Sequence, residues 1–419
     1  MELNPKGSIS KRFLLMSERI RKFLSEYYSI GRDARLLLTS SGMWSVSWGI
    51  YAVIWQLYLK AAGYGGLEIG TYSLVQSFSM TLLTIPCGFI ADRTKRRGLL
   101  IFGGFLGIVS TLIILLSVTM ASLFVSALIA GASWAISGPA WNALFAETVE
   151  ESGMEVGYGL SAFLGNICFA IGNILGWVPE LLVSKLSLTY FSAYRTFLYL
   201  PIVLQILSNT PLVFVKEKFE PISRGLKFRA RGVALKFIIT SALVGFGAGF
   251  SIQLFGYYLS VKFNVESGPI GTLYALSSVL GAPAFLASAP LSSAIGIVRG
   301  VIIPQLVSIP LLILIPFSPN FSLAAALYIP RTMLMNMSNP LVQALMMKLT
   351  PEEERGSVSS LSQMAWNLPN AISSRIGGFL MDYVSIDLPI FITSALYTLY
   401  LVTFYVLFKE EEMTREKHA

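Results

Sequence analysis

Residues 88–97 read Gly-Phe-Ile-Ala-Asp-Arg-Thr-Lys-Arg-Arg, and they join two long apolar runs. The first run covers residues 67–90 and the second begins at residue 98, and each is long enough for a helix that crosses a bilayer. Four basic side chains crowd this joint, and basic residues concentrate in the cytoplasmic loops of membrane proteins. The stretch therefore predicts a short cytoplasmic loop between two membrane-spanning helices.

The composition of the whole chain supports this interpretation. The chain has 419 residues, of which 54% are hydrophobic and only 13% are Asp, Glu, Lys or Arg, about half the charged fraction of a soluble domain. The mean hydropathy is +0.66. These values exclude a water-soluble enzyme and a nucleic-acid-binding protein, despite the net charge of +8. They predict a polytopic helical membrane protein.

Cysteine and histidine are too scarce for several kinds of site. Cys87 and Cys168 lie inside apolar runs, and the single histidine, His418, lies in the polar tail. A disulfide framework, a Cys/His metal centre and a Cys/His nucleophile pair all need more of these residues. The phosphate-binding G-x-x-x-x-G-K-[ST] pattern is missing as well. We therefore expect no metal, no cofactor and no enzymatic activity, and energy from a gradient or a separate partner.

Twelve apolar runs predict twelve membrane-spanning helices and place both termini on one side. They cover residues 36–59, 67–90, 98–118, 121–145, 157–183, 192–215, 237–260, 268–290, 300–317, 321–347, 357–381 and 388–408. The connections on the side of the termini hold 25 Lys and Arg residues, whereas those on the opposite side hold three. This bias predicts cytoplasmic termini in a multi-pass protein of the cell membrane.

An internal duplication divides the predicted spans into two sets of six. Residues 137–145 and 338–346 share Ser, Pro, Ala and Leu at an offset of 201, and the same offset pairs Gly176 with Gly377. Two parallel halves of this kind let secondary transporters rock around a site between them. We expect two six-helix bundles in an all-α membrane protein. The expected segments are a cytoplasmic amphipathic segment at 1–35 with an interfacial helix over 9–28, bundles at 36–215 and 237–408, a linker at 216–236 and a tail at 409–419.

The loop at residues 88–97 also resembles a family signature. Residues 88–97 are similar to the G-x-x-x-D-R-x-G-R-R motif of the major facilitator superfamily, with Lys95 in place of the second glycine. The equivalent stretch of the second half, residues 289–296, keeps a late glycine but has lost the acid. The resemblance implies the twelve-helix fold of that family, a monomer, and transport of a small-molecule substrate by alternating access.

The resemblance further implies a gate at this loop. Asp92 would face the start of the eleventh span near Gly356, where a helix N-terminus favours an anion. Gly88 would permit close approach of the backbone. In the alternative interpretation, the basic residues of the loop only fix the topology.

Other residues extend the predicted gate. Arg93 and Arg97 would pair with acids such as Glu147. Pro139 and Pro340 occupy matching positions of the two halves and predict paired kinks that let the cytoplasmic helix ends bend.

Candidate substrate contacts follow from polar and aromatic residues within the spans. Arg331 lies ten residues into the tenth span, about 15 Å deep and hence near the midplane, and a buried cation marks a functional site by default. A structural role, with Arg331 bonded to backbone carbonyls or Asn336, is the alternative. Further candidates have weaker support individually: Trp48, Tyr51, Trp134, Gln253, Asn367 and Arg375.

The acidic residues lie near the ends of the spans, and no carboxylate is expected mid-span. Together with Arg331, this pattern favours an anionic or neutral amphipathic solute. A proton-coupled multidrug exporter is the main alternative, and protons stay open as a coupling ion. A membrane sensor or lipid-handling protein on the same fold is the third possibility.

Overall fold

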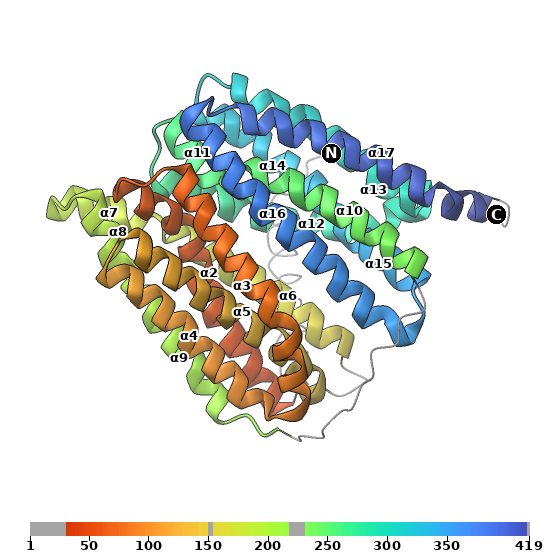
Figure 1. The fold of residues 1–419 in the computed structure, drawn as a ribbon, viewed down its shortest axis with the longest axis horizontal. Coiled ribbons are helices and arrows are strands. Elements are labelled where there is room, and N and C mark those ends of the chain that lie inside the picture. The colour runs from red at the N-terminus through yellow and green to blue at the C-terminus, as the bar shows by residue number, and fades with distance from the viewer. Residues whose placement is uncertain (1–30, 150–153, 218–230, 417–419) are drawn as a thin grey trace, which may run out of the picture.

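The computed structural model describes residues 31–149, 154–217 and 231–416, and every regular element within them is a helix (Figure 1). The predicted interfacial helix at 9–28, most of the predicted linker and His418 lie outside the described residues. The helices of the first half are α2 (Arg32–Ala61), α3 (Gly66–Arg93), α4 (Arg96–Leu116), α5 (Met120–Thr148), α6 (Met154–Ile174), α7 (Trp177–Leu186), α8 (Tyr190–Phe197) and α9 (Tyr199–Val213). Those of the second half are α10 (Arg231–Ser251), α11 (Phe255–Lys262), α12 (Ser267–Ile295), α13 (Ile297–Leu314), η2 (Ile315–Phe317), α14 (Phe321–Met337), α15 (Asn339–Leu349), η3 (Glu352–Glu354), α16 (Arg355–Tyr383) and α17 (Leu388–Glu416).

Each predicted span coincides with one helix or with two consecutive helices. Helices suit these apolar runs because lipid offers no hydrogen bonds to the backbone, so the helix must satisfy its own N–H and C=O groups. By length and composition, seven of the described helices could cross a membrane, or eight if the bent α12 counts as one span. The part of the chain that the structure describes is thus all-helical in its regular elements, with several helices long and apolar enough for a polytopic membrane protein.

The two prolines predicted to form paired kinks behave differently. Pro340 lies next to a break, since α14 ends at Met337 and α15 begins at Asn339. Pro139 lies inside the uninterrupted helix α5. Of these two equivalent predicted spans, the one in the second half is interrupted and the one in the first half is continuous.

Two groups of helices form the body of the molecule. In the first half, α2 packs against α6 and α9, and α5 packs against α3 and α4. In the second half, α10 packs against α16 and α17, and α14 packs against α12 and α13. The helix pairs that join the halves include α3 with α16, α6 and α7 with α12, and α2 with α11 and α12; Figure 1 shows α16 beside α3.

The contacts between the halves concentrate at one end of the molecule. We call the end where α2 begins and α17 ends the proximal end, and the end where α2 connects to α3 the distal end. One hydrophobic core cluster continues from the first half into the second, and its members include Leu57, Ile69, Leu254 and Phe255 near the distal end. A separate cluster, which includes Leu38 and Phe145, belongs to the proximal part of the first half.

Candidate solute cavity and gates

A cavity of about 380 Å³ lies proximal to the contacts that close the distal end. Its walls come from α2, α3, α4, α5, α6 and α9, all in the first half. The lining side chains share the absence of a formal charge: they are Ser40, Ser41, Trp44, Ser45, Ser47, Trp48, Tyr51, Gln76, Leu100, Gly104, Gly107, Ser110, Thr111, Ala130, Ser133, Trp134, Ser137, Gly138, Trp141, Asn142, Ser161, Gly165, Gln205, Ser208, Asn209 and Leu212.

One wall of the cavity is aromatic. Trp44 and Trp48 stack one helical turn apart on α2, and the Trp134 ring of α5 stands edge-on to both, with each centroid 5.2 Å away. Tyr51 continues the stack, 5.7 Å from Trp48. The structure therefore brings together three residues predicted from the sequence, Trp48, Tyr51 and Trp134, on one wall. Such a wall offers flat apolar faces to a ring of a solute.

Another part of the cavity lining is a polar recess formed by residues of α4, α5 and α9. Gly104 leaves room for the Asn209 amide, whose oxygen would lie 2.6 Å from a Cβ at that position. Gln205 donates a hydrogen bond to Ser47 over 3.3 Å, and Ser133 donates to the Gly103 carbonyl. Sequence reasoning missed these polar side chains, because they are scattered singly over three apolar runs and only the fold brings them together.

Arg331 does not line the cavity. Its side chain is 3% exposed in the second half, and the guanidinium carbon lies 5.6 Å from the centre of the Tyr397 ring. Two of its nitrogens, Nε and Nη2, are buried and make no hydrogen bond within the described part of the chain. A guanidinium in this state carries an unused capacity to donate hydrogen bonds.

The other candidates from the second half also lie outside the cavity lining. Gln253 lies between α10 and α11, and its backbone carbonyl accepts a hydrogen bond from Gln56 at 2.8 Å. Asn367 accepts a hydrogen bond from Gln363 on the same helix at 3.2 Å. Arg375 is exposed on α16. The predicted contacts therefore divide into three residues on the cavity wall and four elsewhere.

The predicted gate lies at the proximal end of α3. A Cβ at Gly88 would meet nothing within 4 Å, and the same is true of Gly356 at the start of α16. The side chain of Asp92 lies outside the described part of the structure, and Arg93 is exposed as the last residue of α3. The close approach predicted at Gly88 is not formed in this conformation.

The predicted partner of Glu147 needs a correction. Glu147 pairs with Arg96, which is 1% exposed, and not with Arg93 or Arg97. Arg97 instead donates to the Val215 carbonyl at 3.1 Å. The reason is helical geometry: α4 begins at Arg96, so that side chain turns into the first half toward the end of α5.

Polar contacts between the halves close the distal end. Gln56 accepts a hydrogen bond from the Tyr257 N–H at 2.8 Å, and Lys60 donates to the Ser260 carbonyl at 3.1 Å. Two carboxylates, Asp382 and Glu180, also bond to backbone groups of the opposite half. Sequence reasoning assigned these acids no role because they lie at span ends.

Comparisons with known proteins agree with this architecture. The nucleoside transporter NupG is similar in structure at a TM-score of 0.72, with 14% identity over 90% of this chain and 99% of that one. An inward-facing bacterial homologue of Spinster, a human lysosomal transporter, has a TM-score of 0.71, with 12% identity over 91% and 98% of the two chains. A bacterial homologue of the iron transporter ferroportin has a TM-score of 0.72 in its inward-facing state, with 17% identity over 90% and 98%. Its outward-facing state has a TM-score of 0.61, with 18% identity over 90% and 99%.

A search of curated proteins finds no match. The family model of the Major Facilitator Superfamily matches residues 4–176 and 237–419, which covers most of both halves. The family and the structural neighbours indicate a transporter rather than an enzyme. The chain belongs to the Major Facilitator Superfamily.

Proposed function

We propose that this protein is a secondary active transporter that moves a small, neutral, amphipathic organic solute across the cell membrane by alternating access. The observation that carries the proposal is the chemistry of the cavity. Its volume of about 380 Å³ lies within the usual range of small-molecule sites. Its lining offers an aromatic wall for a ring and a recess of hydroxyl and amide groups for polar substituents, without a charged side chain.

The chemistry of the two walls narrows the solute class. Burial of an ionic group opposite uncharged side chains costs free energy that hydroxyl groups only partly offset. A flat ring gains from Trp48 and Trp134, whereas amide and hydroxyl groups such as Asn209 and Ser133 can both donate and accept. A nucleoside, the substrate class named for NupG, is one solute with these properties.

We also propose twelve membrane-spanning helices with both termini in the cytoplasm, so the proximal end faces inward. The 25 basic residues on that side, against three on the other, support this orientation. The closed distal end and the open space around Gly88 support an inward-facing state. The higher structural likeness to the inward-facing than to the outward-facing ferroportin homologue agrees with this assignment.

Flux measurements in proteoliposomes test the function directly. The panel contains nucleosides, neutral aromatic glycosides, organic anions, organic cations and Fe²⁺, each with and without a pH gradient. We expect saturable flux of neutral ring-bearing solutes, reduced in Trp48→Ala. Flux of hydrophobic cations that depends on a pH gradient would support a multidrug exporter instead, and tight binding without flux would support a sensor.

Arg331 supports a second candidate function, the transport of an organic anion. Two of its buried nitrogens lack a hydrogen-bond partner in the described residues, which is a costly arrangement that an anion could relieve. Arg331→Met is the test, because Met has similar length and no charge. Selective loss of anion flux would favour this second candidate, and unchanged flux of all solutes would exclude it.

A further inference from the structure

Two carboxylates occupy related positions where the halves meet at the distal end. Each comes from one half and lies at the beginning of a long helix of the other half. We propose that Asp382 and Glu180 are a matched pair of helix caps that hold the distal gate closed and thereby set the balance between the two conformations of the transporter. This inference rests on the proposed alternating-access function.

Asp382 of α16 caps helix α3. Its two carboxylate oxygens accept hydrogen bonds from the N–H groups of Gly66, at 2.9 Å, and Leu67, at 2.8 Å. The Tyr257 hydroxyl donates a third hydrogen bond to the same carboxylate at 2.7 Å. The first N–H groups of a helix have no partner within the helix, and its N-terminus carries a partial positive charge. The second half therefore supplies what the first turn of α3 lacks.

Glu180 of α7 caps helix α12 with the roles of the two halves exchanged. Its carboxylate accepts a hydrogen bond from the Gly268 N–H at 2.6 Å. Trp177, one turn earlier on α7, donates from its indole nitrogen to Thr272 of α12 at 2.9 Å. Here the first half supplies the acceptor for the first turn of a helix in the second half.

The internal duplication relates the two caps. An offset of 201 residues carries Leu67 onto Gly268, so the donors occupy the same position of equivalent helices. The same offset carries Glu180 to within one residue of Asp382. The two caps are therefore related by the same offset as the two halves, to within one residue.

The backbones beside the caps approach each other in the same reciprocal manner. A Cβ at Gly70 of α3 would lie 2.5 Å from the Ser374 carbonyl oxygen of α16. Gly271 of α12 abuts the Asn173 carbonyl of α6, and the offset of 201 relates both members of this second contact to those of the first. These contacts hold the helix backbones close together beside both carboxylates, and separation of the backbones at the distal end would move each carboxylate away from the helix it caps.

The two caps therefore stabilise only the conformation in which the distal end is closed. Opening of the distal end would return the N–H groups of Gly66, Leu67 and Gly268 to water or leave them unpaired. Hydrogen bonds to a charged acceptor are stronger than neutral ones, so the closed state gains more than an amide at the same place would give. Asp382 and Glu180 are thus positioning residues of the transport cycle. Asp382 should have the larger effect, because it accepts two hydrogen bonds from the opposite half and Glu180 accepts one.

Distance measurements between spin labels test the proposal in the full-length protein. Cys87→Ser and Cys168→Ala remove the native thiols, and labels are placed at the exposed distal residues Leu186 and Val384. We expect Asp382→Asn to raise the ratio of distally open to distally closed molecules about tenfold, and Glu180→Gln to raise it about threefold. The double variant should exceed either single change.

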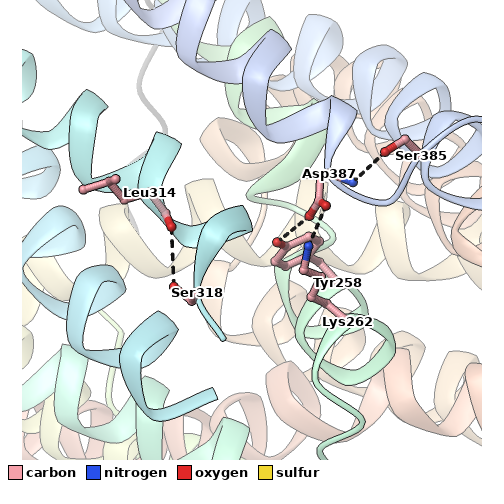
Figure 2. Close-up of polar contacts among 6 residues, drawn as sticks. All are labelled: Tyr258, Lys262, Leu314, Ser318, Ser385 and Asp387. Carbon is pink, nitrogen blue, oxygen red and sulfur yellow. Dashed lines mark hydrogen bonds and ion pairs between the residues drawn. The ribbon is translucent and has the colours of Figure 1, made fainter. Parts of the chain in front are cut away.

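Two other distal carboxylates provide matched controls. Glu68 accepts a hydrogen bond from the Gly65 N–H at the same end of α3, but it belongs to the same half as that helix. Asp387 bonds to Tyr258 and Lys262, also within one half, as Figure 2 shows. Glu68→Gln and Asp387→Asn remove a negative charge from the distal end without cutting a link between the halves, so both should leave the label distances unchanged.

Thiol accessibility keeps the test decisive if a variant folds poorly. Ser267→Cys replaces a residue that is fully buried beside Gly176 in the closed distal interface. Membrane-impermeant maleimide should modify it faster when Asp382→Asn is also present. The proposal would be overturned if Asp382→Asn combined with Glu180→Gln changed neither the spin-label distances nor the rate of maleimide labelling. Because neither readout measures flux, the result is independent of which solute is carried, and a protein that fails to transport can still show the caps.

Discussion

The distal and proximal ends of this transporter differ in how the two halves meet. At the distal end, the Gly66 and Gly378 backbones touch, and a carboxylate from each half caps a helix of the other. At the proximal end, a Cβ at Gly88 or Gly356 would meet nothing within 4 Å. The same helices, α3 and α16, supply both pairs of glycines. One end of a helix pair is therefore packed while the other is free, as a rocking motion about the middle requires.

The proposed gates at the two ends share one physical device but differ in how often they use it. The predicted proximal gate uses the Asp92 loop and a helix N-terminus of the other half. The distal gate uses the same physical device, an acid opposite a helix N-terminus, but twice and reciprocally. Under the proposed alternating access, each end opens as the other closes. A weaker gate at one end should therefore shift the conformational equilibrium toward the state in which that end is open.

The largest effect should come from a side chain added at the packed end. In Gly378→Val, the new Cβ would overlap the Gly66 carbonyl, so the distal end cannot close. Overpacking typically costs up to about 3 kcal/mol, which corresponds to roughly a hundredfold shift of the conformational equilibrium toward the distally open state. Flux in proteoliposomes should fall accordingly. Gly356→Val, the same change in the same helix at the free end, should not raise the distally open population, and equal increases of that population in both variants would contradict the difference between the ends.

A smaller effect should come from the cavity between the two ends. Trp48→Ala removes the ring that stacks on Trp44 and stands edge-on to Trp134. The affinity for a ring-bearing solute should fall about tenfold, because an aromatic contact adds roughly 0.5–1.5 kcal/mol to area burial. Isothermal titration of the purified protein measures this change. Phe214→Ala, at an exposed residue outside the cavity, should bind as tightly as the parent.

The sequence predicted the helices well because their cause is local. Each apolar run is long enough to span the bilayer, and its helix follows from the need to satisfy the backbone. The aromatic wall was partly predictable for the same reason, since Trp48 and Tyr51 share one face of one helix. The offset of 201 residues also held in three dimensions, as the contacts of Gly70 and Gly271 show.

The contacts between side chains of different helices could not be predicted from the sequence. Asn209 and Ser133 become a recess only when α9 and α5 pack beside α4. Glu147 was assigned to the wrong arginines because the inward turn of Arg96 depends on where α4 begins. The roles of Glu180 and Asp382 could have been suspected, since the duplication relates their positions to within one residue. They were not assigned a role because only their depth in the membrane was considered, and both lie at span ends.

A still smaller effect should come from the predicted proximal latch. Asp92→Asn removes the negative charge expected to face the N-terminus of α16. A charge at a helix end contributes about 0.3–1 kcal/mol, so the distally open population should fall roughly two- to fivefold. Spin labels at Leu186 and Val384 measure this population. A change in the opposite direction, or none, would show that the Asp92 loop fixes topology and does not act as a gate.

The smallest effect should come from Gly88, at the open end of α3. Because a Cβ there meets open space, Gly88→Ala should not lower the thermal unfolding temperature, and it can raise the stability of α3 by up to about 1 kcal/mol through helix propensity. Gly66→Ala, on the same helix at the packed end, would bring a methyl group within 3.0 Å of the Gly378 Cα and should lower that temperature. Thermal unfolding in detergent compares the two variants. Equal destabilisation by both would mean that α3 is packed along its whole length, which would contradict an open proximal end.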